Sequence, residues 1–242
     1  MQKLITNALI YFTILVLWQL VSFTFLPSPV EVLISFYHLL QTSSYWVDVG
    51  HSLFRFVAGV GLGIMLGSIV GVALAGFRKV NSVLMPILSF LYPIPKIALL
   101  PLFLIWFGFG EFPKVLLIFM GAFFPVAITT YSSYLRIPQD LIDASHVAGA
   151  SRLYTIRRIV IPYIIPSIVS NSRIPISIGL TLLVAAEMVG ADSGIGQFIM
   201  NTGSLLALDQ MFVGIFTLSL IALLSNFAIS YTEKNFFQWK NA

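Results

Sequence analysis

The few residues of this chain that could do chemistry lie inside or beside long apolar stretches. Lys96 and Arg173 are each the single charged residue of such a stretch, and Asn171 lies close to Arg173. A charged side chain costs roughly 2.5–3.5 kcal/mol at the centre of a membrane on insertion scales, so it usually faces the bundle interior or a water-filled cavity. A cationic, hydroxyl-lined cavity would suit an anionic substrate. Alternatively, the two cations pair with backbone carbonyls that nearby prolines leave free.

Glu187 is the third ionisable candidate, and it lies 14 residues beyond Arg173. The two side chains cannot pair along one helix, because 14 helical residues span about 21 Å. We therefore expect Glu187 at the outer mouth of the bundle. There it either takes part in a translocation pathway, or it is a structural cap or part of a solvated rim.

Other kinds of chemistry lack the residues they need. The chain contains no cysteine, which excludes disulfides, thiolate metal sites and cysteine catalysis. Its three histidines are scattered over loops on both sides, so no metal site is expected, and no nucleophile lies at catalytic spacing from a base. No G-x-x-x-x-G-K-[ST] motif occurs, so an ATP site would have to be in a partner subunit. We expect a chain that is not an enzyme and holds no cofactor of its own.

The composition indicates a membrane protein with several spanning helices. Of the 242 residues 58% are hydrophobic and only 9% charged, whereas a soluble domain carries about 25% charged residues. Six segments reach the roughly 20 apolar residues that a spanning helix needs. They cover residues 8–26, 56–77, 83–109, 115–135, 159–186 and 211–232. The predicted fold is all-α and integral to the membrane, a single domain over residues 1–242 with six transmembrane helices, of which the proline-containing third and fifth are kinked or broken.

The basic residues indicate how this domain is oriented. Cytoplasmic loops of membrane proteins carry an excess of lysine and arginine. Nine basic residues fall in the two tails and the second and fourth loops, whereas Arg55 and Lys114 alone lie on the other side. Both termini should therefore be cytoplasmic. The net charge is +4. Because these cations lie at the ends of apolar segments, we interpret them as signals of membrane orientation and not of nucleic-acid binding. The first segment is expected to stay as an anchor, since no A-x-A-like cleavage site follows it.

The second span carries a ridge of small residues. A small residue recurs at every fourth position, which places these residues on one helix face and permits close packing of another helix. They are Gly59, Gly63, Gly67, Gly71 and Ala75.

A small, polar and basic insert separates the fourth and fifth spans. Residues 139–148 and 151–158 are expected as two short helices, with Pro138 suited to the first turn of the first helix and a sharp bend at Gly149. On physical grounds alone two interpretations are open. The insert is either an amphipathic helix at the membrane surface or a compact knob that a partner protein grips, stiffly connected to a transmembrane helix.

The spacing within this insert resembles the EAA loop of binding-protein-dependent ABC importer permeases. That pattern is Glu-Ala-Ala, three residues, Gly, nine residues, and Ile-x-Leu-Pro. Here Asp143-Ala144-Ser145 is followed after three residues by Gly149 and, after nine more, by Ile-Val-Ile-Pro at 159–162. The departures are Asp for Glu, Ser for the second Ala and Ile for Leu, all chemically mild.

The resemblance implies a permease subunit in which the loop at 136–158 carries the coupling helix. Such a helix docks in a cleft on a cytoplasmic ATP-hydrolysing subunit. Its implied partners are two ATP-binding subunits that hold the ATP and magnesium, a second permease copy, an extracytoplasmic solute-binding protein and the bilayer of the bacterial inner membrane. The implied contact residues are Asp143, Ala144 and Gly149, joined by their neighbours Ser145, Ala148 and Ala150.

Other stretches resemble the branch of this family that serves nitrate, sulfonates, taurine and related small anions. They include "LPSPVEVL" at 26–33, "PIPKIALLPLFLIWFGFGE" at 93–111, "AAEMVG" at 185–190 and "GIGQFI" at 194–199. The implied cargo is a small, anionic solute of unspecified identity. The sequence leaves open whether the second permease is identical, as in a homodimer, or a relative.

Two rival classes make different predictions. A secondary transporter driven by an ion gradient would show inverted repeats and paired acids in the middle of spans. A membrane-embedded enzyme would gather His, Asp or Glu side chains at one depth. Neither pattern is present in the sequence, which favours the importer, with the gradient-driven carrier as the alternative.

Overall fold

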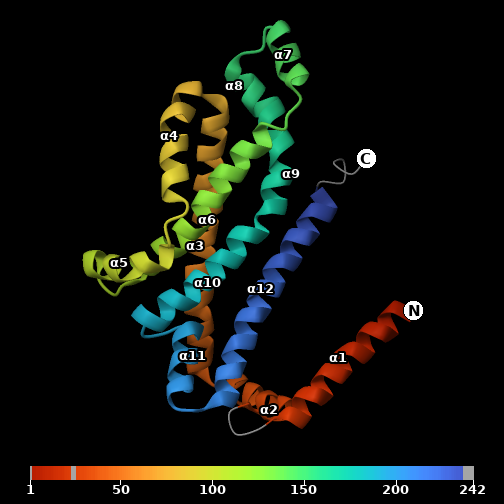
Figure 1. Ribbon diagram of the computed structural model, residues 1–242, viewed down its shortest axis with the longest axis vertical. Helices are drawn as coiled ribbons and strands as arrows, with labels where there is room; N and C mark the ends of the chain where they lie inside the picture. Colours follow the sequence, from red (N-terminus) through yellow and green to blue (C-terminus); the bar gives the residue numbers. More distant parts are fainter. Residues whose placement is uncertain (1, 23–25, 237–242) are drawn as a thin grey trace.

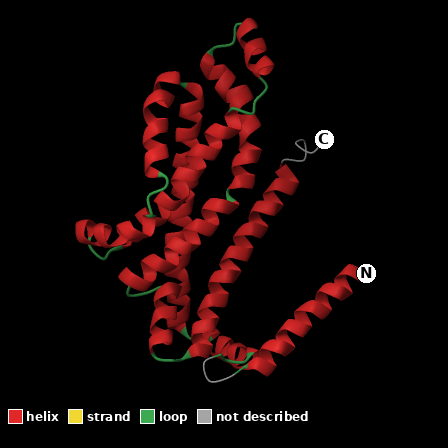
Figure 2. Ribbon diagram, viewed as in Figure 1, coloured by secondary structure: helices red, strands yellow, loops and turns green. Residues whose placement is uncertain are grey.

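The computed structural model describes residues 2–22 and 26–236, and this part of the chain is helical, with short connections and no β-strand (Figure 2). The predicted all-α class is confirmed. In chain order the elements are α1 (Gln2–Val21), α2 (Pro29–Leu40), α3 (Ser43–Gly76), α4 (Arg78–Leu91), η1 (Lys96–Leu99), α5 (Leu100–Phe107), α6 (Glu111–Tyr134), α7 (Gln139–Val147), α8 (Arg152–Thr155), η2 (Ile156–Val160), α9 (Ile161–Asn171), α10 (Arg173–Gly190), α11 (Ile195–Ser204) and α12 (Leu208–Phe236).

The exterior of this bundle is apolar. Large side chains such as Phe54, Ile69, Leu223 and Phe227 are each more than half exposed. Soluble monomers rarely expose contiguous apolar surface of this kind. Five helices are long and apolar enough to cross a membrane, or six if the bent pair α4 and η1–α5 counts as one span. The exterior therefore suits contact with lipid.

Helices α3 and α6 lie along each other at the centre of the bundle (Figure 1), and the glycines of the small-residue ridge face α6. A Cβ atom built on Gly63 would lie 2.5 Å from the Cβ of Ala122, and one on Gly71 would lie 2.5 Å from the Cβ of Thr130. The backbones approach this closely only because the ridge has no side chains. The core around α6 includes Leu117 and Ile118, both fully buried.

We expect Gly63→Leu to separate α3 from α6, and Gly61→Leu to be tolerated. Overfilling a packed interface costs about 1–3 kcal/mol, whereas Gly61 is exposed and has nothing within 4 Å of its Cβ position. The thermal midpoint in detergent should fall for the first variant and stay near that of the parent for the second. Equal midpoints for the two variants would contradict the close packing.

Two of the six predicted spans are not continuous helices. The stretch at 83–109 consists of α4 and η1–α5, which meet at an angle of 86°. Pro93 and Pro95 lie in this break and have no N–H to continue the helical ladder. The stretch at 159–186 divides at Ser172 into α9 and α10. Here Pro175 cannot donate to the carbonyl of Asn171 four residues earlier, which ends the helix there.

The remaining predicted spans lie within single helices. Residues 56–77 fall almost wholly in α3, 115–135 in α6 and 211–232 in α12. The first predicted span, 8–26, overlaps α1, and its residues 23–25 lie outside the described part. Figure 1 places α7 at one end of the molecule and both α2 and α11 at the other.

Candidate functional site

The predicted coupling loop forms two short helices at one end of the bundle. Helix α7 ends in a Schellman motif: the N–H of Gly149 donates to the carbonyl of His146 (2.9 Å), and the N–H of Ala150 donates to that of Ser145 (2.9 Å). Gly149 adopts φ +77°, the left-handed region that favours glycine. The chain then turns into α8, whose first N–H groups are capped by Ser151 through Tyr154 N–H (3.3 Å).

This loop is seated on the bundle through one side of α7. Ile142 is buried and packs in a cluster with Ile137, Val160 and Ile164. Ser145 is also buried; its hydroxyl donates to the carbonyl of Ile142 (2.7 Å) and lies 3.0 Å from the hydroxyl oxygen of Thr155. The prediction that Ser145 contacts a partner is therefore not supported by its position, because its side chain faces α8.

The other side of α7 is open. Four of the remaining predicted contact residues are exposed, and Ala150 is half-buried. The exposed ones are Asp143, Ala144, Ala148 and Gly149. Val147, which the sequence prediction did not include, is 90% exposed at the C-terminal end of α7. Val147 joins the exposed side of this projecting helix, and its signal in the sequence was a valine on the polar side of the insert.

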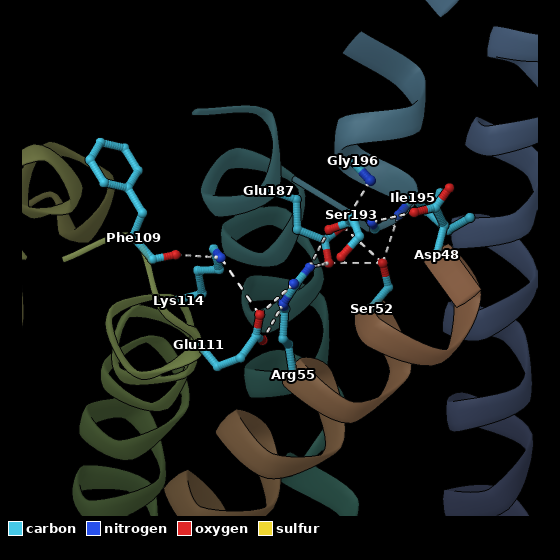
Figure 3. A network of polar contacts seen from close by, with 11 residues as sticks. Asp48, Ser52, Arg55, Phe109, Glu111, Lys114, Glu187, Ser193, Ile195 and Gly196 are labelled. Carbon is cyan, nitrogen blue, oxygen red and sulfur yellow. Dashed lines mark hydrogen bonds and ion pairs between the residues drawn. The ribbon is translucent and has the colours of Figure 1, made fainter. Parts of the chain in front are cut away.

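A second concentration of polar groups lies where α3, α6, α10 and the start of α11 meet, and Arg55 is its centre (Figure 3). The Arg55 Nε and Nη2 atoms donate to the two carboxylate oxygens of Glu111, at 2.6 Å each. Its Nη1 donates to Glu187 (2.8 Å) and to the carbonyl of Ser193 (2.6 Å). Arg55 is only 1% exposed, so its charge is matched inside the protein.

Glu187 is completely buried within this network, so it does not lie on a solvated rim. The Ser52 hydroxyl contacts both of its carboxylate oxygens at 2.8 Å, and the N–H of Gly196 donates to it at 2.8 Å. The N–H of Ile195 donates in turn to Ser52 (2.8 Å), and that of Gly194 donates to Asp48 (2.7 Å). The network thus ties the turn before α11 to α3, and a side chain on Gly194 would collide with Glu187 at 2.5 Å.

Arg55, Glu111 and Lys114 were counted in the sequence only as charges at or near the edges of spans. Lys114 lies 3.6 Å from Glu111 and donates to the carbonyl of Phe109 (3.0 Å). Their signal in the sequence was a charge beside a predicted span, which gives no indication of its partner.

Lys96 lies at the bend between α4 and η1. Its ammonium donates to the carbonyl of Tyr92 and lies about 5 Å from the ring centres of Tyr92 and Phe124. Of the cations described inside the apolar segments, it is the one with no carboxylate within 4 Å. Lys96 is also only half-buried.

Arg173 lies at the break between α9 and α10 and pairs with Glu233 of α12 at 2.5 Å. Neither of the alternatives that the sequence suggested, a substrate cavity or free backbone carbonyls, included this carboxylate. Asn171, the last residue of α9, is half-buried. The four predicted pathway residues are therefore not gathered in one place: Glu187 and Arg173 have partners on different helices, and Lys96 lies at a separate bend.

These features define a class of protein. Several apolar helices, two buried or paired ion networks and a projecting helical knob fit a multi-pass membrane permease subunit. Among residues 2–22 and 26–236 no group of three or more His, Asp or Glu side chains could hold a metal ion.

Comparison with known proteins gives the family. Residues 59–238 match the model of the binding-protein-dependent transport system inner membrane component, and the chain belongs to this family of ABC importer permeases. It is 32% identical over 236 residues to the putative aliphatic sulfonates transport permease protein SsuC of Bacillus subtilis, covering 95% of this chain and 85% of the relative. It is 32% identical over 226 residues to the taurine transport system permease protein TauC of Escherichia coli, covering 91% and 82%. Members of this family are permease subunits and not enzymes, because a separate subunit hydrolyses ATP.

Solved structures share the fold. An inward-facing MetNI methionine ABC transporter chain superposes with a TM-score of 0.67 at 24% identity, covering 77% of this chain and 93% of that one. A chain of a bacterial ABC transporter involved in the import of alginate gives a TM-score of 0.65 at 16% identity, covering 98% and 99%. At these identities the likeness concerns the fold alone.

Proposed function

We propose that the chain forms half of the translocation pathway for a small organic sulfonate or a similar anion in the bacterial inner membrane. A solute-binding protein delivers the cargo, a second copy of the chain completes the pathway, and two ATP-binding subunits with their ATP and magnesium drive it. The observation that carries this proposal is that one side of α7 is exposed. The chain leads from α7 through α8 and η2 into the membrane helix α9. A partner that moves α7 therefore moves a membrane helix directly.

The proposed orientation places both termini in the cytoplasm. The start of α4, which carries Arg78 and Lys79, lies at the same end of the molecule as α7 (Figure 1). The basic residues of the second and fourth loops therefore share one end, as the charge rule for cytoplasmic loops requires.

The nature of the cargo is supported by the relatives and by Lys96. Two relatives are named for aliphatic sulfonates and for taurine, and both kinds of molecule carry a sulfonate anion. Because Arg55 and Arg173 are paired with carboxylates, Lys96 is the membrane-embedded cation left to meet an anion. The rings of Tyr92 and Phe124 beside it provide apolar surface for a short alkyl group.

A cargo panel tests this proposal. The permease, with its ATP-binding subunits and binding protein, is reconstituted in vesicles, and uptake of labelled taurine, ethanesulfonate, nitrate and a neutral amide is compared. Uptake of one or both sulfonates above the neutral amide is expected. Uptake of the neutral amide alone would exclude the anion pathway.

We expect Lys96→Gln to lower sulfonate uptake about tenfold, while Lys96→Arg keeps most of it. A hydrogen bond to a charged group is worth roughly 1.5–3 kcal/mol, and each 1.36 kcal/mol corresponds to a factor of about ten. The measurement is initial uptake rate in vesicles, with the amount of assembled complex as control. Full uptake by the glutamine variant would remove Lys96 from the pathway.

A further inference from the structure

The ion pair between Arg173 and Glu233 joins the break in the fifth apolar stretch to the C-terminal part of α12. The Arg173 Nη2 atom donates to Glu233 Oε2 (2.5 Å) and to the Ser230 hydroxyl (3.1 Å). The hydroxyl of Ser170 donates to the other carboxylate oxygen of Glu233. Glu233 therefore holds residues on both sides of the break at Ser172, one at the end of α9 and one at the start of α10.

The two partners lie at different places along their own helices. Glu233 comes directly after the apolar run 211–232 of α12, at its cytoplasmic end in the proposed orientation. Arg173 instead lies 14 residues into the stretch 159–186. Since the two side chains touch, the helices from Arg152 to Asn171 extend past the end of α12, and Figure 1 shows α9 rising beyond it towards α7. These 20 residues form an arm about 30 Å long at 1.5 Å per residue.

The helical hydrogen-bond ladder is interrupted where this ion pair is found. Pro175 has no N–H to donate to the carbonyl of Asn171, so one helical hydrogen bond is missing at the break. Hinges are commonly a few element-terminal residues that absorb a change in backbone angles. The arm that carries the coupling loop therefore meets α10 at a hinge, and Glu233 fixes that hinge to a third helix.

We propose that Glu233 is a positioning residue that makes this hinge the fulcrum of the coupling arm. When α7 is displaced, the arm turns about the point held by Glu233, and the displacement passes into α10 and α12 together. Without Glu233 the arm bends freely at Ser172, and movement of α7 is lost before it reaches the pathway. This role rests on the proposed function, because it needs an ATP-binding subunit to move α7.

The test is the number of ATP molecules hydrolysed per molecule imported, measured in vesicles with the complete complex. We expect Glu233→Gln and Arg173→Gln each to raise this ratio at least about fivefold, within the 5–150-fold range typical of coupling between two sites. The amount of bound ATP-binding subunit should not change. The charge-exchanged double variant Arg173→Glu with Glu233→Arg should bring the ratio back towards that of the parent. Lys234→Gln, on the neighbouring exposed residue, is the control and should leave the ratio unaltered.

The outcomes separate the two proposals. ATP-driven import with an unchanged ratio in the glutamine variants would overturn the fulcrum alone, as would a loss of thermal stability without any change in the ratio. Absence of ATP-driven import in the unmodified complex would overturn the proposed function and the fulcrum with it.

Discussion

Replacing Gly149 with leucine is expected to lower both binding of the ATP-binding subunit and ATP-driven uptake at least about tenfold while leaving membrane insertion intact. Gly149 has φ +77° and closes the Schellman motif at the end of α7. A left-handed conformation costs an L-residue with a Cβ atom roughly 1–2 kcal/mol. Leucine relieves this strain by opening the motif, and α7 then leaves its seat, in which its Ile142 packs on Val160 and Ile164.

The matched control for this prediction is Gly149→Asn. Asparagine is the residue other than glycine that most readily ends a helix in the left-handed region. Because nothing lies within 4 Å of the Cβ position of Gly149, the asparagine side chain meets no obstacle in the free permease. Binding measured by co-purification, and uptake measured in vesicles, should stay within about threefold of the parent, since the short polar side chain of asparagine can offset the cost of the left-handed region by local hydrogen bonding. Normal uptake by the leucine variant would show that the shape of this turn does not matter for coupling.

Removing Arg55 is expected to destabilise the protein more than any other single replacement considered above. Arg55→Leu leaves Glu187 as a buried carboxylate without its cation, and breaking a buried pair in this way costs about 3–5 kcal/mol. The additional change Glu187→Gln removes the unpaired charge while an amide can still meet Ser52 and Gly196. The double variant should therefore unfold at a higher temperature than Arg55→Leu alone.

A second replacement that restores stability lost through the first distinguishes a buried ion network from ordinary packing. Independent sites give additive effects, whereas residues in one network show coupling energies of about 0.5–3 kcal/mol. Thermal unfolding of the parent, the two single variants and the double variant in one detergent gives the coupling directly. A double variant that is no more stable than Arg55→Leu would contradict the network.

The long-range arrangement of the site is what the sequence could not provide. The apolar runs locate the helices because hydropathy is a local property, and the spacing from Asp143 to Gly149 locates the projecting loop because its turn chemistry is local as well. The partners of Glu187 lie at Ser52 and Arg55, more than 130 residues earlier in the chain. Hydropathy places such charges near the edge of a span but gives no information on which of them meet.

Arg173 shows the same limit in another form. Its position in the middle of an apolar stretch suggested a place in the middle of the membrane. That inference assumed one continuous span, but the stretch breaks at Ser172 and the arginine meets the end of α12 at Glu233. The position of a residue within an apolar stretch therefore does not give its level in the bundle, because the neighbouring helices begin and end at different levels.

In the proposed function, ATP hydrolysis in a partner subunit drives transport through this chain. The direct test is uptake of taurine into vesicles that contain the permease with its ATP-binding subunits and external binding protein. We expect uptake that requires ATP on the side of the ATP-binding subunits and persists when ionophores abolish all ion gradients. Uptake that stops with the ionophores and continues without ATP would contradict it and identify a gradient-driven carrier.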